Sequence, residues 1–510
     1  MEDLVRIPVY PSTPLPQGNI NFSSRYPNLM TENKKDLGAF YTPLHTAEYM
    51  VRLLRNLDEK SRVLEPCGGD GVFVRALLKN TSLKPEQIEV WDINPEVKKN
   101  IIKFGVKFEI KDTLLETNFD GLFRPVFTHI VGNPPYLNKQ SLYIKKNKNK
   151  LKKIYKEIGA NDTYAMFLYL CGNLLAPNGE LVFIISDTYR TLRIHKKLRR
   201  WLLENFVIKE ITLCPPSLFK NKGTMVQTSI IYLVKDNPTK NSKIKFNDCR
   251  KNQIGDYNGK IWEVPQLDIL KYPDYVFYFE NKKKLLTLIS SAEKRMADFL
   301  DGGLGMHTTN NKKYLALIVY PGERVKSNKG IKNFVPFQLV NEKNKWRIYH
   351  KTGGNNKYYK KPTYAIRWDE ESIKKYKMLK GLEKYKDRQG FVVSGVCSNL
   401  SARIAFRGAL WESNKAMCFF PKNPKEYPVY FFIGILNSKP YNEMIKIINH
   451  TNSIQIRDIK KLPMFNFSKE DIKKVSSISR FIISKLKRNP YFNFKKYQEE
   501  IDKIVLKYIN

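Results

Sequence analysis

Between residues 38 and 235, short apolar runs alternate with amphipathic stretches. The apolar runs are long enough for buried strands and end near residues 65, 92, 110, 132, 186, 213 and 234. Between them, apolar residues recur three or four positions apart, as Ala47, Met50, Val51 and Leu54 do, which is typical of helices with one buried face. This alternation predicts a doubly wound, mostly parallel α/β sheet with helices on both faces. Helices are expected near 162–176 and 191–204, and the last strand, 226–234, is expected to be antiparallel.

The regular alternation ends near residue 240, where a polar, lysine-rich stretch follows the last predicted strand. Beyond it come short strand-like runs, glycine turns and many Lys and Asn residues. Two helices are predicted over residues 470–508, because Val475, Ile478, Ile482 and Leu486 recur at helical spacing. We therefore expect three parts: an irregular arm over 1–37, an α/β domain over 38–240 and a mixed α+β domain over 241–510.

Composition adds a strong positive charge to this picture. The 510 residues include 89 Lys and Arg against 49 Asp and Glu, a net charge of +40. Such an excess indicates a polyanionic partner. A membrane surface is the alternative, but no apolar run reaches the roughly 18 residues of a spanning helix, and the N-terminus does not resemble a signal peptide. We expect a cytoplasmic prokaryotic protein that does not bind membranes.

The cysteines and histidines do not form a recognisable site. The six cysteines are scattered without a Cys-x-x-Cys pair, and the six histidines are equally dispersed. Neither a disulfide framework nor a metal site is therefore expected.

A glycine-rich turn follows the first predicted strand. Residues 62–73 read Arg-Val-Leu-Glu-Pro-Cys-Gly-Gly-Asp-Gly-Val-Phe, which predicts a strand, a turn and the start of a helix. Glu65 and Pro66 stand where a dinucleotide-binding loop has its first glycine, so the pyrophosphate fingerprint is absent. An acid at this turn favours a cationic or hydroxylated ligand over a phosphate. S-adenosylmethionine, which has a sulfonium, an ammonium and a ribose, fits both preferences.

Acidic residues follow the next two predicted strands. Asp92 ends the strand that begins at Ile88, about twenty residues after the turn, where an acid can accept hydrogen bonds from ribose hydroxyls. Asp112 follows the strand at 106–110 and is placed to accept the exocyclic amine of an adenine. The alternative is that either aspartate simply caps a helix, which aspartate often does.

The chain then presents Asn133-Pro134-Pro135-Tyr136 directly after the apolar run 129–132. An amide, two prolines and an aromatic ring at the end of a strand make a stiff, aromatic-walled pocket, because proline fixes its own backbone. Such a pocket suits a planar amino group held before an electrophile.

The order of these motifs resembles the gamma group of DNA adenine-N6 methyltransferases from restriction–modification systems. In that family a Thr-Pro segment, here Thr42-Pro43, precedes the Glu-Pro turn and the Asn-Pro-Pro-Tyr loop. The resemblance implies a class I methyltransferase domain over 38–240 that binds S-adenosylmethionine, and a target-recognition domain over 241–510. It implies that the cofactor contacts are Phe40, Tyr41, Thr42, Glu65, Pro66, Cys67, Gly68, Gly71, Asp92, Ile93, Asp112, Thr113 and Asn133.

The expected chemistry is methyl transfer to N6 of an adenine in duplex DNA. The nitrogen is a poor nucleophile, and the Asn133 side-chain oxygen and the Pro134 carbonyl are the two proposed acceptors of its N–H groups, on a loop stiffened by Pro134 and Pro135. A base in a duplex must first be flipped out. Tyr136 is expected to form one face of the clamp that holds it, and the family resemblance implies Phe219 as the other. The alternative for Phe219 is a core residue under a loop.

Basic residues are the candidates for DNA contact. Residues 139–156 hold eight lysines and no acid, and Lys139, Lys145 and Lys146 are expected in a mobile loop that contacts the DNA strand. The alternative is a solvated face. In the second half, Arg403, Arg407, Asn414 and Lys415 are candidate base-reading residues, with surface solubility as the alternative.

Other activities remain as alternatives. An RNA base or release-factor glutamine methyltransferase can share Asn-Pro-Pro-Tyr, although those proteins lack a recognition half. Cytosine-C5 chemistry needs a Pro-Cys nucleophile at the catalytic strand, whereas Cys67 lies in the cofactor turn, and cytosine-N4 enzymes tend to carry Ser in place of Asn133. A binding module with a dead site is a third class. Residues 1–37 are too few for a nuclease domain, so a separate restriction endonuclease is the expected genetic partner of a monomeric enzyme.

Overall fold

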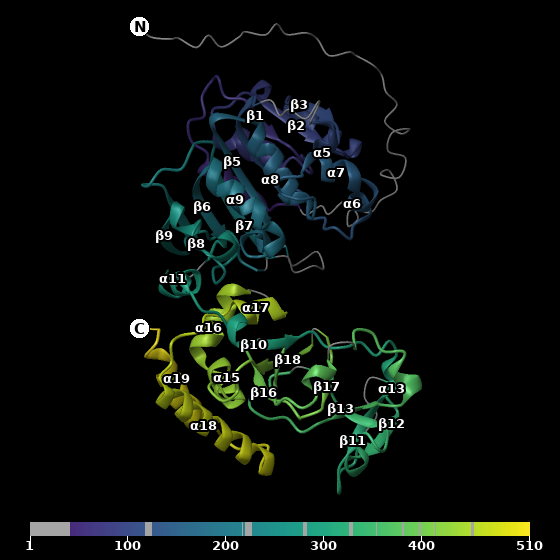
Figure 1. Ribbon diagram of the computed structural model, residues 1–510. Coiled ribbons are helices and arrows are strands. Elements are labelled where there is room, and N and C mark those ends of the chain that lie inside the picture. The colour runs from purple at the N-terminus through teal and green to yellow at the C-terminus, as the bar shows by residue number, and fades with distance from the viewer. Residues whose placement is uncertain are drawn as a thin grey trace, which may run out of the picture. The chain divides into compact units, whose positions relative to one another are not determined.

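The computed structural model divides the chain into two compact units (Figure 1). Unit 1 comprises residues 1–187 and 204–264, and unit 2 comprises residues 188–203 and 265–510. The structure describes residues 41–117, 125–216, 218–219, 227–278, 283–325, 330–352, 354–379, 382–396, 399–413, 415–449 and 453–509.

Unit 1 is built on a nine-stranded sheet with the order β3-β2-β1-β4-β5-β7-β6-β8-β9. Neighbouring strands from β3 to β5 are parallel, whereas β7 is antiparallel to both β5 and β6. This confirms the predicted doubly wound, mostly parallel sheet and its antiparallel strand. The strands are β1 (Val63–Glu65), β2 (Ile88–Asp92), β3 (Lys107–Ile110), β4 (Phe127–Gly132), β5 (Leu175–Ser186), β6 (Val207–Leu213), β7 (Thr228–Val234), β8 (Lys243–Asp248) and β9 (Lys260–Pro265).

Helices cover the sheet because its central strands are apolar on both faces. Val131 and Val182 belong to one buried cluster with residues of α2 and α3. The alternate residues Ile130 and Leu181 are also fully buried and point to the opposite face, where α8 packs against β5. The helices of this unit are α2 (Leu44–Leu53), α3 (Val72–Asn80), α4 (Lys98–Ile101), α5 (Thr113–Glu116), α6 (Leu142–Lys146), α7 (Lys148–Ile154) and α8 (Thr163–Leu174).

Two predictions about this region need correction. The predicted boundary near residue 240 falls inside the sheet, because β8 and β9 continue it and β8 pairs in parallel with β6. The helix expected at 191–204 exists as α9 (Lys196–Asn205), but most of it groups with unit 2. Arg199 shows why, since its buried guanidinium donates to the carbonyl of Asp274, a residue of unit 2.

Unit 2 contains a four-stranded sheet, β10-β18-β15-β16, and a five-stranded sheet, β12-β11-β14-β13-β17. Most of the strand pairs in both are antiparallel, as expected for a mixed α+β unit. The strands are β10 (Leu300–Gly303), β11 (Leu315–Val319), β12 (Asn333–Pro336), β13 (Trp346–His350), β14 (Tyr364–Arg367), β15 (Phe391–Ser394), β16 (Ala402–Ile404), β17 (Leu410–Trp411) and β18 (Ala416–Pro421).

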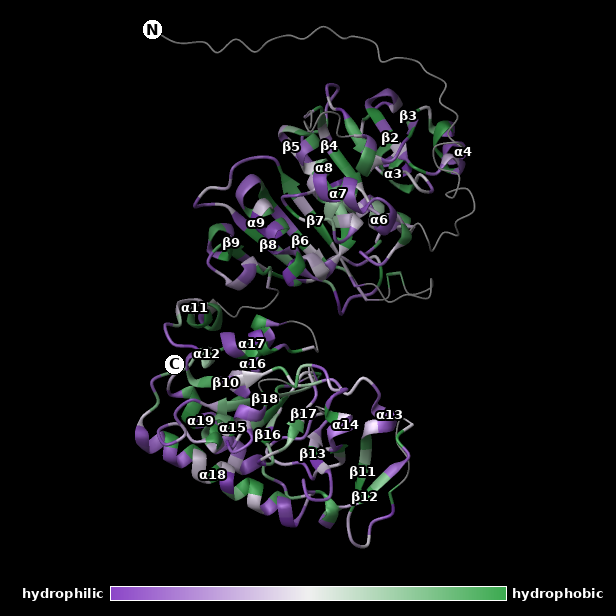
Figure 2. Cartoon of the chain, turned by 45° about the vertical axis from the view of Figure 1, so that its right-hand side comes forward, coloured by the Kyte–Doolittle hydropathy of each residue, from purple (hydrophilic) through white to green (hydrophobic). Residues whose placement is uncertain are grey.

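The C-terminal helices of unit 2 pack around one apolar helix, α15 (Val429–Leu436). Gly434 permits the close approach of α18, because a Cβ at this position would lie 2.6 Å from Val475 Cγ1 and from Ser479 Oγ. Figure 2 shows the mixed polarity of α18, whose polar residues lie on one side. The two helices predicted over 470–508 are confirmed. The remaining helices are α10 (Gln266–Ile269), α11 (Lys283–Ser291), α12 (Met296–Phe299), α13 (Asn311–Tyr314), α14 (Glu370–Ile373), α16 (Lys439–Ile448), α17 (Ile456–Lys461), α18 (Lys469–Arg488) and α19 (Lys495–Leu506).

Gly71, at the start of α3, is expected to tolerate alanine poorly. Its φ is +79°, and a Cβ there would meet Ile101 Cδ1 at 3.0 Å and Phe104 Cε2 at 3.2 Å. Gly322 is a matched control, because its φ is +78° and a Cβ would meet nothing within 4 Å. We expect Gly322→Ala to lower the free energy of unfolding by about 1–2 kcal/mol for its left-handed backbone, and Gly71→Ala to lower it further. Equal losses in urea denaturation would show that crowding at Gly71 is relieved by its neighbours.

Candidate active site

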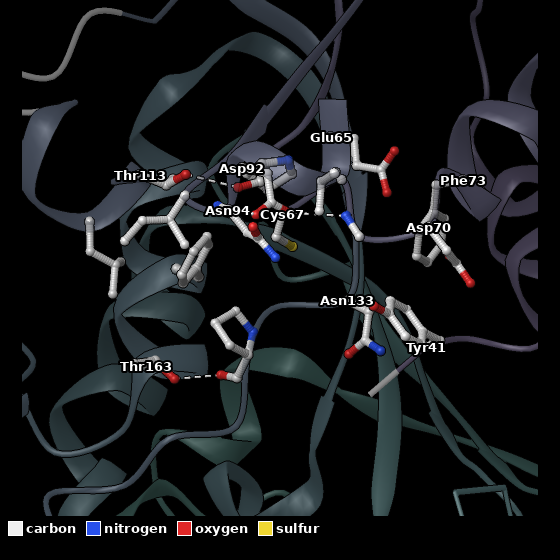
Figure 3. Close-up of a pocket in the computed structure, with 18 of the residues that line it drawn as sticks. Tyr41, Glu65, Cys67, Asp70, Phe73, Asp92, Asn94, Thr113, Asn133 and Thr163 are labelled. Carbon is white, nitrogen blue, oxygen red and sulfur yellow. Dashed lines mark hydrogen bonds between the residues drawn. The ribbon is translucent and has the colours of Figure 1, made fainter. Parts of the chain in front are cut away.

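A cavity lies at the carboxyl ends of β1, β2 and β4, where ligands of open α/β sheets bind (Figure 3). It holds about 1120 Å³ of empty space, part of it open to solvent. The residues that line it come from the segment before α2, the glycine-rich turn, the ends of strands and the helices α3, α5, α6 and α8. They are Tyr41, Thr42, Glu65, Pro66, Cys67, Gly68, Gly69, Asp70, Val72, Phe73, Asp92, Ile93, Asn94, Val97, Asp112, Thr113, Leu114, Asn133, Pro135, Leu137, Tyr143, Thr163 and Phe167.

Glu65 is the last residue of β1 and brings an acid into this cavity. Its side chain is only 1% exposed, and its Oε2 atom has no hydrogen-bond partner among the described residues. Burial, together with the nearby Asp70 and Asp92, raises the pKa of Glu65 well above its usual range. A buried acid in this state can be stabilised by a positive charge, so the site fits a cationic ligand.

Asp92 ends β2 and organises the glycine turn. One carboxylate oxygen accepts from the Gly69 N–H at 3.0 Å, and the other accepts from the Asn94 N–H at 2.8 Å. Burial raises the pKa of Asp92, while these hydrogen bonds oppose the shift. A carboxylate has about four acceptor sites, so Asp92 can also accept from ligand hydroxyls.

Asp112 caps a helix and also lines the cavity. It caps α5 by accepting from the N–H groups of Leu114 and Leu115. The Tyr143 hydroxyl lies 2.9 Å from each of its carboxylate oxygens. Burial raises the pKa of Asp112 to about 6, and the Tyr143 hydrogen bond acts against this shift.

The Asn-Pro-Pro-Tyr loop leaves the end of β4 and is fixed by hydrogen bonds at several points. Asn133 Nδ2 donates to Thr42 Oγ1 at 3.0 Å, which orients the amide against the Thr-Pro segment. Thr163 Oγ1, at the start of α8, donates to the Pro135 carbonyl and accepts from the Leu137 N–H. The cavity wall therefore presents Asn133 and Pro135 on a loop held from two other parts of the chain.

The two aromatic residues proposed as a clamp, Tyr136 of this loop and Phe219, lie close to each other. The rings of Tyr136 and Phe219 are 6.5 Å apart and nearly perpendicular, and the Tyr136 hydroxyl donates to the Ile184 carbonyl at 3.1 Å. Phe219 is 3% exposed and belongs to the core cluster of the sheet, as its alternative role implied. Neither ring, nor Pro134, lines the cavity.

Most of the residues predicted to contact the cofactor line this one cavity. Of that set, Gly71 does not line the cavity, and Phe40 lies outside the described residues. Residues that the sequence did not suggest are also present, chiefly Tyr143 and Thr163. Both carry hydroxyls, and their contacts with Asp112 and Pro135 become visible only in the folded structure.

The residues proposed to contact DNA differ in their exposure to solvent. Lys139, Lys145 and Lys146 are exposed in unit 1, and Arg407 and Lys415 are exposed in unit 2. The expected loop over 139–156 is wrong, because this segment forms α6 and α7. Arg403 is also corrected: it is 2% exposed on β16 and donates to the Thr352 carbonyl at 2.7 Å, so it cannot contact a base without moving. Asn414 lies outside the described residues.

The cysteines of this region remain thiols at neutral pH. Burial raises the pKa of Cys67 well above its usual range, with Glu65 and Asp92 adding to the shift, and burial raises the pKa of Cys214 to about 12. Neither is prepared to act as a nucleophile.

Among the described residues, no group of three or more His, Cys, Asp or Glu side chains could hold a metal ion. In the same part of the chain, every helix is too short or too polar to cross a bilayer.

Several known proteins are similar to this chain. Type II methyltransferase M.AccI of Acinetobacter calcoaceticus is 26% identical over 254 residues, which cover 49% of this chain and 44% of that protein. Type II methyltransferase M.HincII of Haemophilus influenzae is 29% identical, covering 36% of this chain and 35% of its own length. Adenine-specific methyltransferase PglX of Lacticaseibacillus casei (strain Zhang) is 23% identical, covering 70% and 31%. The chain thus spans less than half the length of each relative.

Solved structures extend the likeness in fold over nearly the whole chain. A DrdV–DNA complex matches 91% of this chain and 58% of its own, with a TM-score of 0.53 and 14% identity. A nuclease-deletion mutant of the type ISP restriction-modification enzyme LlaGI, in complex with a DNA substrate mimic, matches 91% and 56% with a TM-score of 0.53 and 13% identity. A sequence model described as N-6 DNA Methylase matches residues 22–299. Because this match covers more than half of the 510 residues, the chain belongs to the N-6 DNA Methylase family.

Proposed function

We propose that this protein transfers a methyl group from S-adenosylmethionine to N6 of an adenine flipped out of duplex DNA. The observation that carries the proposal is the position of Asn133, whose amide lines a cavity that also contains three buried or half-buried acids. The names of the relatives, type II and adenine-specific methyltransferases, support it.

The acids fit the cofactor group by group. Glu65 has a buried acceptor atom suited to a positive group, Asp92 suits the ribose hydroxyls, and Asp112 suits the adenine amine. When bound, S-adenosylmethionine supplies an electrophilic methyl group. The protein's own contribution is to orient the reactants and to place acceptors where charge develops.

Asn133 is the residue proposed to prepare the nucleophile. Its Nδ2 is committed to Thr42, so the amide presents its oxygen in a fixed direction. That oxygen and the Pro134 carbonyl accept the two N–H groups of the target amine, which shifts the nitrogen toward tetrahedral geometry. The Thr163 bond to Pro135 holds the loop that carries both acceptors.

Unit 2 is the proposed target-recognition unit, and the exposed Arg407 and Lys415 remain candidates for contact with DNA. The high net positive charge supports a nucleic acid as substrate. A separate cognate endonuclease remains a proposal that rests on the family resemblance, as does the monomeric state.

Tyr136→Ala is expected to weaken capture of the flipped base. One base–aromatic stack contributes about 1–3 kcal/mol, so the KM for DNA should rise while cofactor affinity stays near that of the wild type. The measurement is the fluorescence of 2-aminopurine placed at the target adenine, which should rise less on binding to the variant. Tyr136→Phe is the control, because it keeps the ring and removes only the hydroxyl bond to Ile184. Unchanged fluorescence in Tyr136→Ala would remove this residue from the clamp.

The proposal as a whole is tested by sequencing modified bases in genomic DNA from cells that express the chain. We expect N6-methyladenine at one recurring sequence. Methylation confined to RNA or to a glutamine of another protein would instead favour the alternative activities that share the Asn-Pro-Pro-Tyr loop.

A further inference from the structure

Next to the cavity lies a strongly basic element, which we call the basic hairpin and define as residues 139–156. It comprises α6, α7 and their flanks, and Figure 2 shows both helices as largely hydrophilic. The segment has no acidic residue. Its eight lysines are all exposed: Lys139, Lys145, Lys146, Lys148, Lys150, Lys152, Lys153 and Lys156.

Two tyrosines anchor the basic hairpin to the protein. The hydroxyl of Tyr143, on α6, lies 2.9 Å from both carboxylate oxygens of Asp112. The hydroxyl of Tyr155, which follows α7, donates to the Leu114 carbonyl at 2.9 Å. Tyr155 and Leu151 are fully buried, so the apolar side of the hairpin is packed while its lysines face solvent.

The segment to which the two tyrosines bind, residues 112–114, also forms part of the cavity wall. Asp112, Thr113 and Leu114 all line it, and Thr113 Oγ1 donates to the Pro66 carbonyl in the glycine-rich turn. Asp112 and Leu114 therefore contact the tyrosines of the hairpin and also line the ligand space, while Thr113 between them contacts the glycine-rich turn. The hydroxyls of Tyr143 and Tyr155 therefore connect the hairpin directly to residues that line the cavity.

We propose that the basic hairpin docks on the phosphate backbone of duplex DNA and that Tyr143 couples this contact to cofactor affinity. The proposal deepens the function above and rests on it. Eight exposed lysines without an acid among them match a polyanion. DNA that holds the hairpin also holds Tyr143, and hence Asp112, in one orientation. Cofactor binding then loses less conformational freedom, so each ligand should tighten the binding of the other by the same factor.

The test is calorimetric titration of S-adenosylhomocysteine, the unreactive product, into the full chain with and without a short mixed-sequence DNA duplex. For the wild type we expect the duplex to tighten binding by about fivefold or more, the lower range of measured couplings. Added salt should reduce this factor without changing affinity in the absence of DNA.

Three variants locate the coupling. In Lys145→Gln/Lys146→Gln, the affinity without DNA should match the wild type, and the duplex should have a smaller effect. In Tyr143→Phe, the duplex should still bind, but its effect on cofactor affinity should fall toward onefold, whatever happens to the affinity without DNA. Lys240→Gln/Lys251→Gln, which changes two exposed lysines elsewhere in unit 1, should behave as the wild type.

The outcomes separate the two proposals. If the wild type does not bind S-adenosylhomocysteine at all, the proposed function fails. If it binds but the duplex has no effect, or if Tyr143→Phe keeps the full effect, the coupling is overturned while the proposed function stands. If the control lysine pair loses the effect as fully as the hairpin pair, general charge and not the hairpin carries it, which also overturns the inference.

Discussion

Asn133→Ala is expected to reduce methyl transfer to adenine by about 10²–10³-fold, the usual cost of removing one group that stabilises a transition state. The side chain faces the cavity and is oriented by its hydrogen bond to Thr42. Its proposed bond is to the target base and not to the cofactor. The Kd for S-adenosylmethionine should therefore stay close to that of the wild type, which calorimetry can measure beside single-turnover methylation.

Asn133→Asp provides the matched control for this residue. The aspartate keeps an acceptor oxygen at the same position but cannot donate to Thr42 when ionised, so it should retain more activity than the alanine variant. If Asn133→Ala instead loses cofactor binding and keeps its rate at saturating cofactor, the residue belongs to the cofactor site and the proposed role is wrong.

Binding of S-adenosylmethionine at pH 7 is expected to release a proton from Glu65. Burial and two neighbouring acids raise the pKa of Glu65 well above its usual range, which favours its protonated form before the ligand binds. A cation in contact with the carboxylate lowers this pKa, so a proton leaves Glu65 as the complex forms. Titration in buffers with different ionisation enthalpies measures the proton directly.

In Glu65→Gln the side chain has no carboxyl proton to release and cannot become negatively charged. The variant should show no release from this site, and it should bind S-adenosylmethionine more weakly by about 1.5–3 kcal/mol, the contribution of a hydrogen bond to a charged group. Glu86→Gln, which changes an exposed acid of the same unit, should leave both quantities unchanged. Proton release of equal size in Glu65→Gln would assign it to another group, such as Asp92 or Asp112.

Most of unit 1 was predictable because its strands are short, apolar and separated by helical spacing. The end of the sheet was not, because β8 lies in a lysine-rich stretch that looks like a linker. Only Ile244 and Phe246, two positions apart and fully buried, mark it as a strand. So short a period-two pattern among charged residues is easily overlooked.

Most of the residues that line the cavity were predictable, because they stand in recognisable motifs at the ends of successive predicted strands. The supporting contacts were not. Tyr143 reaches Asp112 across 31 positions of sequence, and Thr163 reaches Pro135 across 28, so both depend on the folded arrangement. The burial of Arg403 was equally hidden, because a charged residue in a short strand gives no sign of facing the interior.

The most direct measurement of the central claim uses purified protein, S-adenosylmethionine labelled in its methyl group and duplex DNA of varied sequence, followed by digestion to nucleosides and mass spectrometry. The account predicts label in N6-methyldeoxyadenosine from the wild type and its near absence with Asn133→Ala. Label in a cytosine, in RNA or in a protein, with every adenine unmodified, would contradict it.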